Sequence, residues 1–237
     1  DAFEESLVAI WQKVLDVRPI GLHDDFFELG GHSLIAGRMF QQIEKTLGVR
    51  GSPALLLRAP TVERLAKALR RDAMGAAEES LVPIQTSGPK PPLFCMHAGA
   101  GTVLFYYELA RLLGEDQPVY GLQARGLYGG VAPHRSVEEM ASHYVGQIRS
   151  VQPRGPYQLG GFCFGAVLAF EMAQQLRAAG EEVALLCSFD GPAPGHGDPH
   201  PEEREPPATG AASSCGGASA AQLRALRTKI RSVWSGA

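Results

Sequence analysis

The chain has 237 residues, of which 45% are hydrophobic and 20% are charged, and its formal net charge at pH 7 is −3. This composition excludes a disordered acidic tail and predicts a chain that folds in water. The sequence contains no apolar run long enough to span a membrane and no basic leader before an apolar stretch. We therefore expect no membrane association and a cytoplasmic location. The lack of a basic stripe argues against a nucleic-acid partner.

The first 72 residues show three amphipathic helical patterns, which predict a small bundle. Thr61 follows Pro60 and is a candidate N-cap for the last helix. Residues 73–92 lose the hydrophobic period and become rich in proline and glycine, which indicates a linker. The apolar helix positions are Leu7, Ile10, Trp11, Val14 and Leu15, then Ile35, Met39, Ile43 and Leu47, then Val62, Leu65 and Leu69.

From Leu93 onward, short apolar runs alternate with helical patterns, which predicts a parallel sheet covered on both faces. Residues 191–220 are rich in Pro, Gly, Ala and Ser and are predicted to be an irregular loop, followed by a basic helical tail over 222–234. The expected strands are Leu93–Met96, Val119–Leu122, Tyr157–Leu159 and Val183–Phe189, and the expected helices are Tyr106–Leu113, Val137–Val151 and Ala166–Ala179.

The four cysteines form no CxxC pair, and a chain of this length needs no disulfide to fold, so we expect free thiols. Cys95 and Cys187 lie within apolar strands and are predicted to be core residues. Cys215 lies among Ser and Gly and is expected to be an incidental exposed thiol. Cys163 has a different context.

The segment from Pro156 to Ala166 leads from a strand through Gly-Phe-Cys-Phe-Gly into an alanine-rich helix. This is the context of a nucleophile elbow, with Cys163 in the place usually taken by serine. Gly161 and Gly165 would allow the sharp turn that exposes such a side chain. The alternative is that Cys163 is a small buried hydrophobic residue.

Two further features fit such a site. Residues 97–101, His-Ala-Gly-Ala-Gly, follow the first strand of the domain and resemble an oxyanion loop of the HxxxG type. Gly99 and Phe164 would then be the backbone donors, and His97 would shape the loop. Asp190 ends a strand 27 residues after Cys163 and is the candidate acid that orients a base, although it could instead form a turn.

Near the N-terminus, the segment from Asp24 to Leu34 reads DDFFELGGHSL. It resembles the carrier-domain motif DxFFxLGGHSL of nonribosomal peptide synthetases at every position. The resemblance implies that Ser33 receives 4′-phosphopantetheine from coenzyme A through a phosphopantetheinyl transferase. A phosphodiester at a helix start is physically favourable. Taken alone, Ser33 could be an N-cap, and Asp24, Asp25 and Glu28 could form only a solvated turn.

The whole chain then resembles the end of a nonribosomal peptide synthetase. The resemblance implies a small all-α carrier-protein helix bundle (1–72), a linker (73–92) and an α/β-hydrolase thioesterase domain (93–237) whose mostly parallel sheet is flanked by helices. The implied function is transfer of a peptidyl or acyl thioester from the carrier to Cys163, and its release by hydrolysis or cyclisation. Upstream condensation and adenylation domains of the synthetase are the implied partners.

The sequence departs from this family in two ways. Cysteine replaces the usual serine, so the acyl-enzyme would be a thioester. Only His196 and His200 follow Asp190, both in the irregular loop, so we expect the catalytic histidine to be missing and the domain to be C-terminally incomplete, truncated in its lid region. One alternative is a carrier followed by a non-catalytic, hydrolase-like docking domain. Another is a free-standing dienelactone-hydrolase-like enzyme, against which the carrier motif argues.

Overall fold

The structure is a computed structural model that describes residues 1–72, 80–127 and 131–190. The predictions made for 191–237, which include the irregular loop, the basic tail, His196, His200 and Cys215, lie outside the described residues. No helix within the described ranges is long and apolar enough to cross a membrane.

The first part of the chain is a helical unit, residues 1–72, as the amphipathic patterns predict. Its helices are α1 (Ala2–Leu15), α2 (Ser33–Leu47), the short α3 (Leu55–Arg58) and α4 (Val62–Asp72). The fully buried side chains at its centre include Leu7, Trp11, Phe26, Met39, Ile43, Leu56, Leu65 and Leu69. The three predicted helices are confirmed, and α3 is an additional single turn between two of them.

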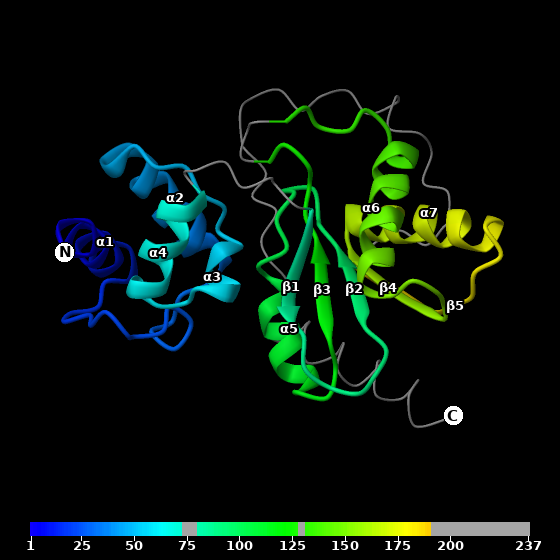
Figure 1. Cartoon of the computed structure of the whole chain (residues 1–237), viewed down its shortest axis with the longest axis horizontal. Coiled ribbons are helices and arrows are strands. Elements are labelled where there is room, and N and C mark those ends of the chain that lie inside the picture. The colour runs from blue at the N-terminus through cyan, green and yellow to red at the C-terminus, as the bar shows by residue number, and fades with distance from the viewer. Residues whose placement is uncertain (73–79, 128–130, 191–237) are drawn as a thin grey trace.

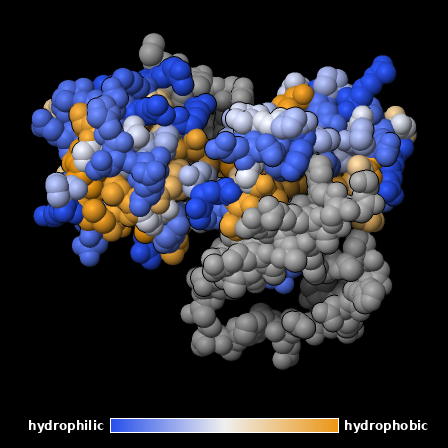
Figure 2. All heavy atoms as spheres, turned by 90° about the horizontal axis from the view of Figure 1, so that it is seen from below, coloured by the Kyte–Doolittle hydropathy of each residue, from blue (hydrophilic) through white to orange (hydrophobic). Residues whose placement is uncertain are grey.

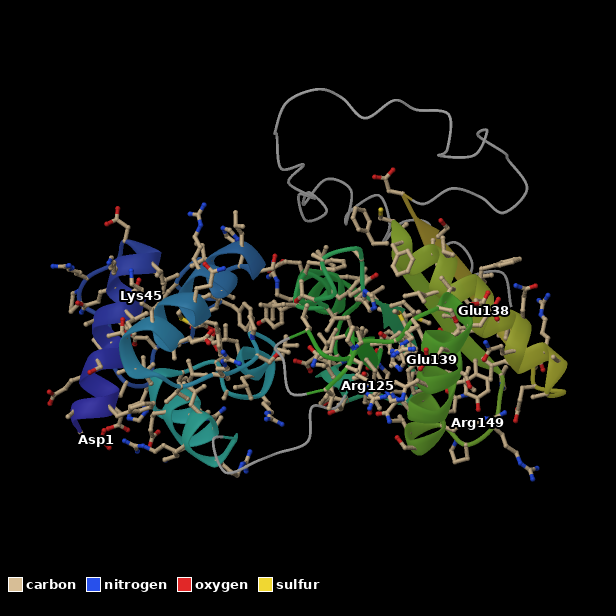
Figure 3. All side chains as sticks on the ribbon, turned by 90° about the horizontal axis from the view of Figure 1, so that it is seen from above. Asp1, Lys45, Arg125, Glu138, Glu139 and Arg149 are labelled. Carbon is tan, nitrogen blue, oxygen red and sulfur yellow. The ribbon has the colours of Figure 1, made fainter. Side chains whose placement is uncertain are left out.

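Side chains cap and join these helices. The Asp1 carboxylate accepts hydrogen bonds from the backbone of Phe3 and Glu4, and so caps α1. Arg70 of α4 donates to both carboxylate oxygens of Asp1 at 2.8 Å. Figure 3 shows Asp1 at the end of the unit far from the sheet. Thr61 accepts a hydrogen bond from the Arg64 N–H at 3.3 Å, so its predicted capping role is confirmed.

The rest of the described chain is a sheet unit with the order β1-β3-β2-β4-β5. Strand β1 is antiparallel to β3, and the other neighbours are parallel (Figure 1). The connecting helices alternate with the strands, as in other α/β folds with a mostly parallel sheet. The elements are β1 (Leu81–Gln85), β2 (Leu93–Met96), α5 (Tyr106–Leu113), β3 (Val119–Leu122), α6 (Val137–Val151), β4 (Tyr157–Phe162), α7 (Phe164–Ala178) and β5 (Val183–Phe189).

Alternation along β2 places hydrophobic side chains on both faces of the sheet. Phe94 and Met96 belong to the core formed with α6 and α7. Leu93 and Cys95 belong to the opposite core, formed with α5. Helices α6 and α7 therefore cover one face and α5 covers the other (Figure 1). Because β3 and β4 lie on opposite sides of β2, the chain reverses its winding there, and the carboxyl ends of β2 and β4 flank a switch point.

Strand β1 was not predicted, because it falls in the proline-rich range 73–92 that the sequence indicates as a linker. Leu81 pairs with Leu122 and Val82 with Gly121. Pro83 is tolerated because β1 lies at an edge of the described sheet, where a missing N–H breaks no ladder on the outer side. The sheet unit therefore begins about ten residues before Leu93, and the linker is shorter than predicted.

The two units touch beside the start of α5. The ring of Phe27, from the Asp24–Leu34 segment, stacks on Tyr107 with ring centroids 3.9 Å apart. Leu104 packs into the core of the helical unit. In the other direction, Ala54 and Leu57 pack into the core under α5.

Candidate active site and carrier site

Cys163 lies between β4 and α7, as the nucleophile-elbow pattern predicts. Its backbone has φ 53° and ψ −117°, a conformation that non-glycine residues rarely adopt. Its side chain is exposed, whereas Cys95 is buried and Cys187 is half-buried. The strained turn therefore turns this thiol outward at the carboxyl end of β4.

The neighbouring glycines make the turn possible because backbone fills the space where their side chains would lie. A Cβ on Gly161 would lie 1.9 Å from the carbonyl oxygen of Gly165. A Cβ on Gly165 would lie 2.5 Å from the carbonyl oxygen of Met96 and 2.8 Å from that of His97. Helix α7 thus starts in direct backbone contact with β4 and with the end of β2.

Asp190 lies next to the elbow. Strands β4 and β5 are parallel, and Phe162 pairs with Phe189, so the residues that follow them lie at the same sheet edge. The Cys163 N–H donates to the carbonyl of Phe189 at 3.0 Å. Asp190 is exposed, and its backbone has a φ of 55°. The structure therefore brings Cys163 and Asp190 to adjacent strand ends.

The loop that contains Gly99 lies on the other side of the elbow. Met96, the last residue of β2, pairs with Gly161 of β4. The loop then turns tightly, with the Gly101 N–H donating to the Ala98 carbonyl at 2.9 Å. Gly99 is exposed, and a Cβ there would meet nothing within 4 Å. Phe164 is the first residue of α7, and the first N–H groups of a helix have no partner within it.

His97 fills the space behind this loop. It is buried, with 3% of its surface exposed, and its Nδ1 lies 2.7 Å from the Ala98 carbonyl. Its ring lies 6.0 Å from the rings of both Tyr144 and Phe164. Burial lowers the pKa of His97, so the neutral imidazole is favoured. These contacts fit a residue that shapes the loop rather than one that exchanges protons.

Two further histidines near His97 were missed by the sequence analysis. His134 and His143 have ring centroids 4.8 Å apart, and His134 also faces Tyr144. Burial lowers the pKa of both imidazoles, and the charge of Arg125 acts in the same direction. Figure 3 shows Arg125 on the side of the sheet unit where α6 lies. No sequence motif marks this pair, because the histidines come from separate segments.

Electrostatics separate the described thiols. Burial raises the pKa of Cys187 to about 11, and complete burial raises that of Cys95 still further. Cys95 is the core residue that the sequence predicts, whereas Cys187 is only partly buried. Cys163 alone among the described cysteines is exposed, and it lies at the N-terminus of α7.

Ser33 is the first residue of α2, not its N-cap. The N-cap is His32, whose side chain makes no capping hydrogen bond, and the first turn contains no acidic residue. Asp25 organises the preceding turn by accepting from the N–H groups of Phe27 and Glu28. The start of α2 is therefore positive and free of side-chain caps, which suits a phosphodiester on Ser33.

The described residues contain no group of three or more His, Cys, Asp or Glu side chains that could hold a metal ion.

Comparison with known families decides the identity of both units. The thioesterase domain model matches residues 91–230, more than half of the chain. The chain belongs to the thioesterase domain family. The phosphopantetheine attachment site model matches residues 5–69, and domains of that kind carry 4′-phosphopantetheine covalently on a serine. The helical unit is thus a carrier domain, and the sheet unit is a thioesterase of the α/β-hydrolase fold.

Several similar proteins are large synthetases. The chain is 43% identical over 187 residues to the dimodular nonribosomal peptide synthase of Bacillus subtilis, which covers 79% of the chain and 8% of the synthase. It is 45% identical over 189 residues to malpibaldin synthetase of Mortierella alpina, covering 79% of the chain and 3% of that protein. The chain spans only a small part of the length of these relatives.

A solved structure of a nonribosomal peptide synthetase is also similar to this chain. A four-domain nonribosomal peptide synthetase, holo-AB3403 bound to AMP and glycine, superposes with a TM-score of 0.53 and 36% identity. The match covers 82% of this chain and 15% of that protein.

Proposed function

We propose that this chain is the terminal carrier and thioesterase segment of a nonribosomal peptide synthetase, with Ser33 as the phosphopantetheine attachment residue and Cys163 as the nucleophile. The observation that carries the thioesterase part is the exposed thiol at a strained turn, adjacent to Asp190 and to the loop that contains Gly99. Condensation and adenylation domains upstream in the synthetase would supply the acyl chain.

In the first step, the Ser33 hydroxyl attacks the β-phosphate of coenzyme A on a phosphopantetheinyl transferase. Phosphopantetheine is transferred to the serine oxygen, and the nucleotide part of coenzyme A leaves. Leu34, next to Ser33, is 62% exposed. Figure 2 shows hydrophobic areas on the helical unit in the face seen from below. An exposed leucine beside the attachment serine is suited to binding the transferase and the other domains.

In the second step, the Cys163 thiolate attacks the carbonyl carbon of the acyl chain on the phosphopantetheine thiol. The N–H groups of Gly99 and Phe164 stabilise the oxyanion. When the carbonyl re-forms, the phosphopantetheine thiol leaves and the acyl chain remains on Cys163 as a thioester. Water, or an amine or hydroxyl of the chain itself, then releases it.

Asp190 would orient the histidine that transfers the protons. Within the described residues, no hydrogen bond or ion pair joins a histidine to Cys163 or Asp190. We propose that this histidine lies outside the described residues.

The carrier assignment is tested by treating the protein with coenzyme A and a phosphopantetheinyl transferase. The intact mass should increase by one phosphopantetheine, and Ser33→Ala should abolish the increase. Ser136→Ala is the matched control, because Ser136 also begins a helix but caps α6 through its side chain. A Ser33→Ala protein that still gains the mass would contradict the assignment.

The nucleophile assignment is tested by incubating the protein with a small soluble acyl thioester and mapping the acyl group by peptide mass spectrometry. The acyl group should be on Cys163, and Cys163→Ala should remove it. Cys187→Ala, the control, should leave the labelling unchanged. Acylation of Cys95 or Cys187 instead would show that the elbow does not carry the nucleophile.

A further inference from the structure

The hydroxyl of Tyr106 joins two strands at the candidate active site. Tyr106 is the first residue of α5 and is 1% exposed. Its Oη donates to the carbonyl oxygen of Met96 at 2.7 Å and accepts from the N–H of Phe162 at 2.9 Å. Its ring also meets the ring of Phe189 edge-on, with centroids 6.4 Å apart and planes at 61°.

These three contacts reach the three parts of the site. Met96 immediately precedes the loop that contains Gly99, Phe162 immediately precedes Cys163, and Phe189 immediately precedes Asp190. One side chain therefore touches the last residue before the oxyanion loop, before the nucleophile and before the acid.

The two backbone groups that the hydroxyl contacts face each other across β2 and β4. Alternate residues of an inner strand bond to opposite neighbours, and the His97 N–H donates to Leu122 of β3 at 3.0 Å. The Met96 carbonyl therefore faces β4, where Met96 pairs with Gly161, and the next donor on β4 is the Phe162 N–H. Both of these groups also bond to the Tyr106 oxygen. The hydroxyl therefore ties β2 and β4 together at their carboxyl ends, at the switch point.

From this geometry we infer that Tyr106 is a positioning residue of the thioesterase, which sets the spacing between the oxyanion loop and the nucleophile. The inference rests on the proposed function, since it takes Cys163 as the nucleophile and Gly99 as a donor. Without the hydroxyl, the Met96 carbonyl and the Phe162 N–H would each lose a hydrogen bond to a side chain that holds both. We expect this loss to loosen the position of Cys163 relative to the loop. Burial raises the pKa of Tyr106, so its hydroxyl keeps the proton that it donates to Met96.

The test compares Tyr106→Phe with Tyr157→Phe in the full chain. Both changes remove only a hydroxyl from a buried ring. The Tyr157 hydroxyl donates to the Gln152 carbonyl at 3.0 Å, at the opposite end of β4 from Cys163. For each variant, the rate at which a small acyl thioester acylates Cys163 is compared with the rate at which iodoacetamide alkylates it. Alkylation needs an accessible thiol but no oxyanion donor. Thermal unfolding reports the stability of each variant.

Tyr106→Phe should lower the acylation rate by about tenfold to a hundredfold, because small displacements of reacting groups have effects of this size. Alkylation should change by less than about threefold, because it needs only an exposed thiol and Tyr106→Phe leaves the thiol exposed. Tyr157→Phe should lower the unfolding temperature similarly and leave both rates near wild type.

Equal acylation by wild type and Tyr106→Phe would overturn the role of Tyr106 while leaving Cys163 as the nucleophile. If Tyr157→Phe loses as much acylation rate as Tyr106→Phe, the cause is general destabilisation, and the positioning role of Tyr106 is wrong. If wild-type Cys163 is not acylated at all, the proposed nucleophile fails, and the inference fails with it.

Discussion

Replacing Gly161 by alanine places a methyl group inside the backbone of α7. The new Cβ would lie 1.9 Å from the Gly165 carbonyl oxygen and 2.0 Å from its carbon, where ordinary contacts begin at 3.4 Å. The start of α7 would have to move by about 1.5 Å, the difference between 3.4 and 1.9 Å. Overpacking against movable side chains costs about 1–3 kcal/mol. Because fixed backbone is the obstacle here, we expect a loss of at least about 3 kcal/mol.

Urea unfolding, followed by circular dichroism, measures this loss. Gly146→Ala is the matched control, because Gly146 lies within α6 and a Cβ there meets nothing within 4 Å. It should stabilise the protein by about 0.5–1 kcal/mol, the ordinary gain from replacing a helical glycine. The two substitutions should therefore shift the urea midpoint in opposite directions. If Gly161→Ala unfolds at the wild-type urea concentration, the close contact between β4 and α7 is wrong.

Three further predictions follow from burial and contact. Because the folded state lowers the pKa of His97, the unfolded chain gains a proton first, so the free energy of unfolding should fall as the pH drops below about 6.5. His97→Gln should make the free energy of unfolding, measured by urea titration, fall less with pH. If the pH dependence is unchanged in His97→Gln, His97 does not cause it. Iodoacetamide at pH 8 should label Cys163 far faster than Cys187. With a pKa of about 11, only about one Cys187 side chain in a thousand is a thiolate at this pH. Peptide mapping measures the two rates, and equal labelling would refute the prediction. Tyr107→Ala should remove the stack on Phe27 and slow acyl transfer from the carrier, but not acylation by a soluble thioester; equal slowing of both would refute a docking role.

Local patterns in the sequence predicted most of the fold. The bounds of β2, α5, β3, α6 and β5 agree with the apolar runs and amphipathic periods, because each is a continuous segment whose burial follows its own spacing. Strand β1 was not predicted, because its pairing with β3 is non-local and because Pro83 is a residue that is uncommon in strands. No local pattern reports which distant strand an edge segment will join.

In the candidate site, too, local patterns predicted some residues and not others. Glycine spacing around Cys163 predicted the elbow, since the turn needs small residues at fixed offsets, and the structure brings Asp190 and Gly99 to neighbouring strand ends. Tyr106 carries no such signal. Its two hydrogen bonds connect backbone groups 10 and 56 residues away along the chain, and a tyrosine at a helix start is indistinguishable from a packing residue.

Helix α5 contacts both the turn at Cys163 and the carrier. Its first two residues face opposite ways: Tyr106 is buried under the elbow, and the ring of Tyr107 stacks on Phe27 of the carrier. Phe27 belongs to the same segment as Ser33, so the segment that carries the attachment serine rests on the helix that contacts both the proposed nucleophile turn and the end of β2. We therefore expect any shift of the start of α5 to displace the turn at Cys163 as well, because closely packed interiors transmit displacements. We therefore expect the contact of the carrier with α5 to stabilise the proposed thioesterase site, in addition to any role in delivering the acyl chain.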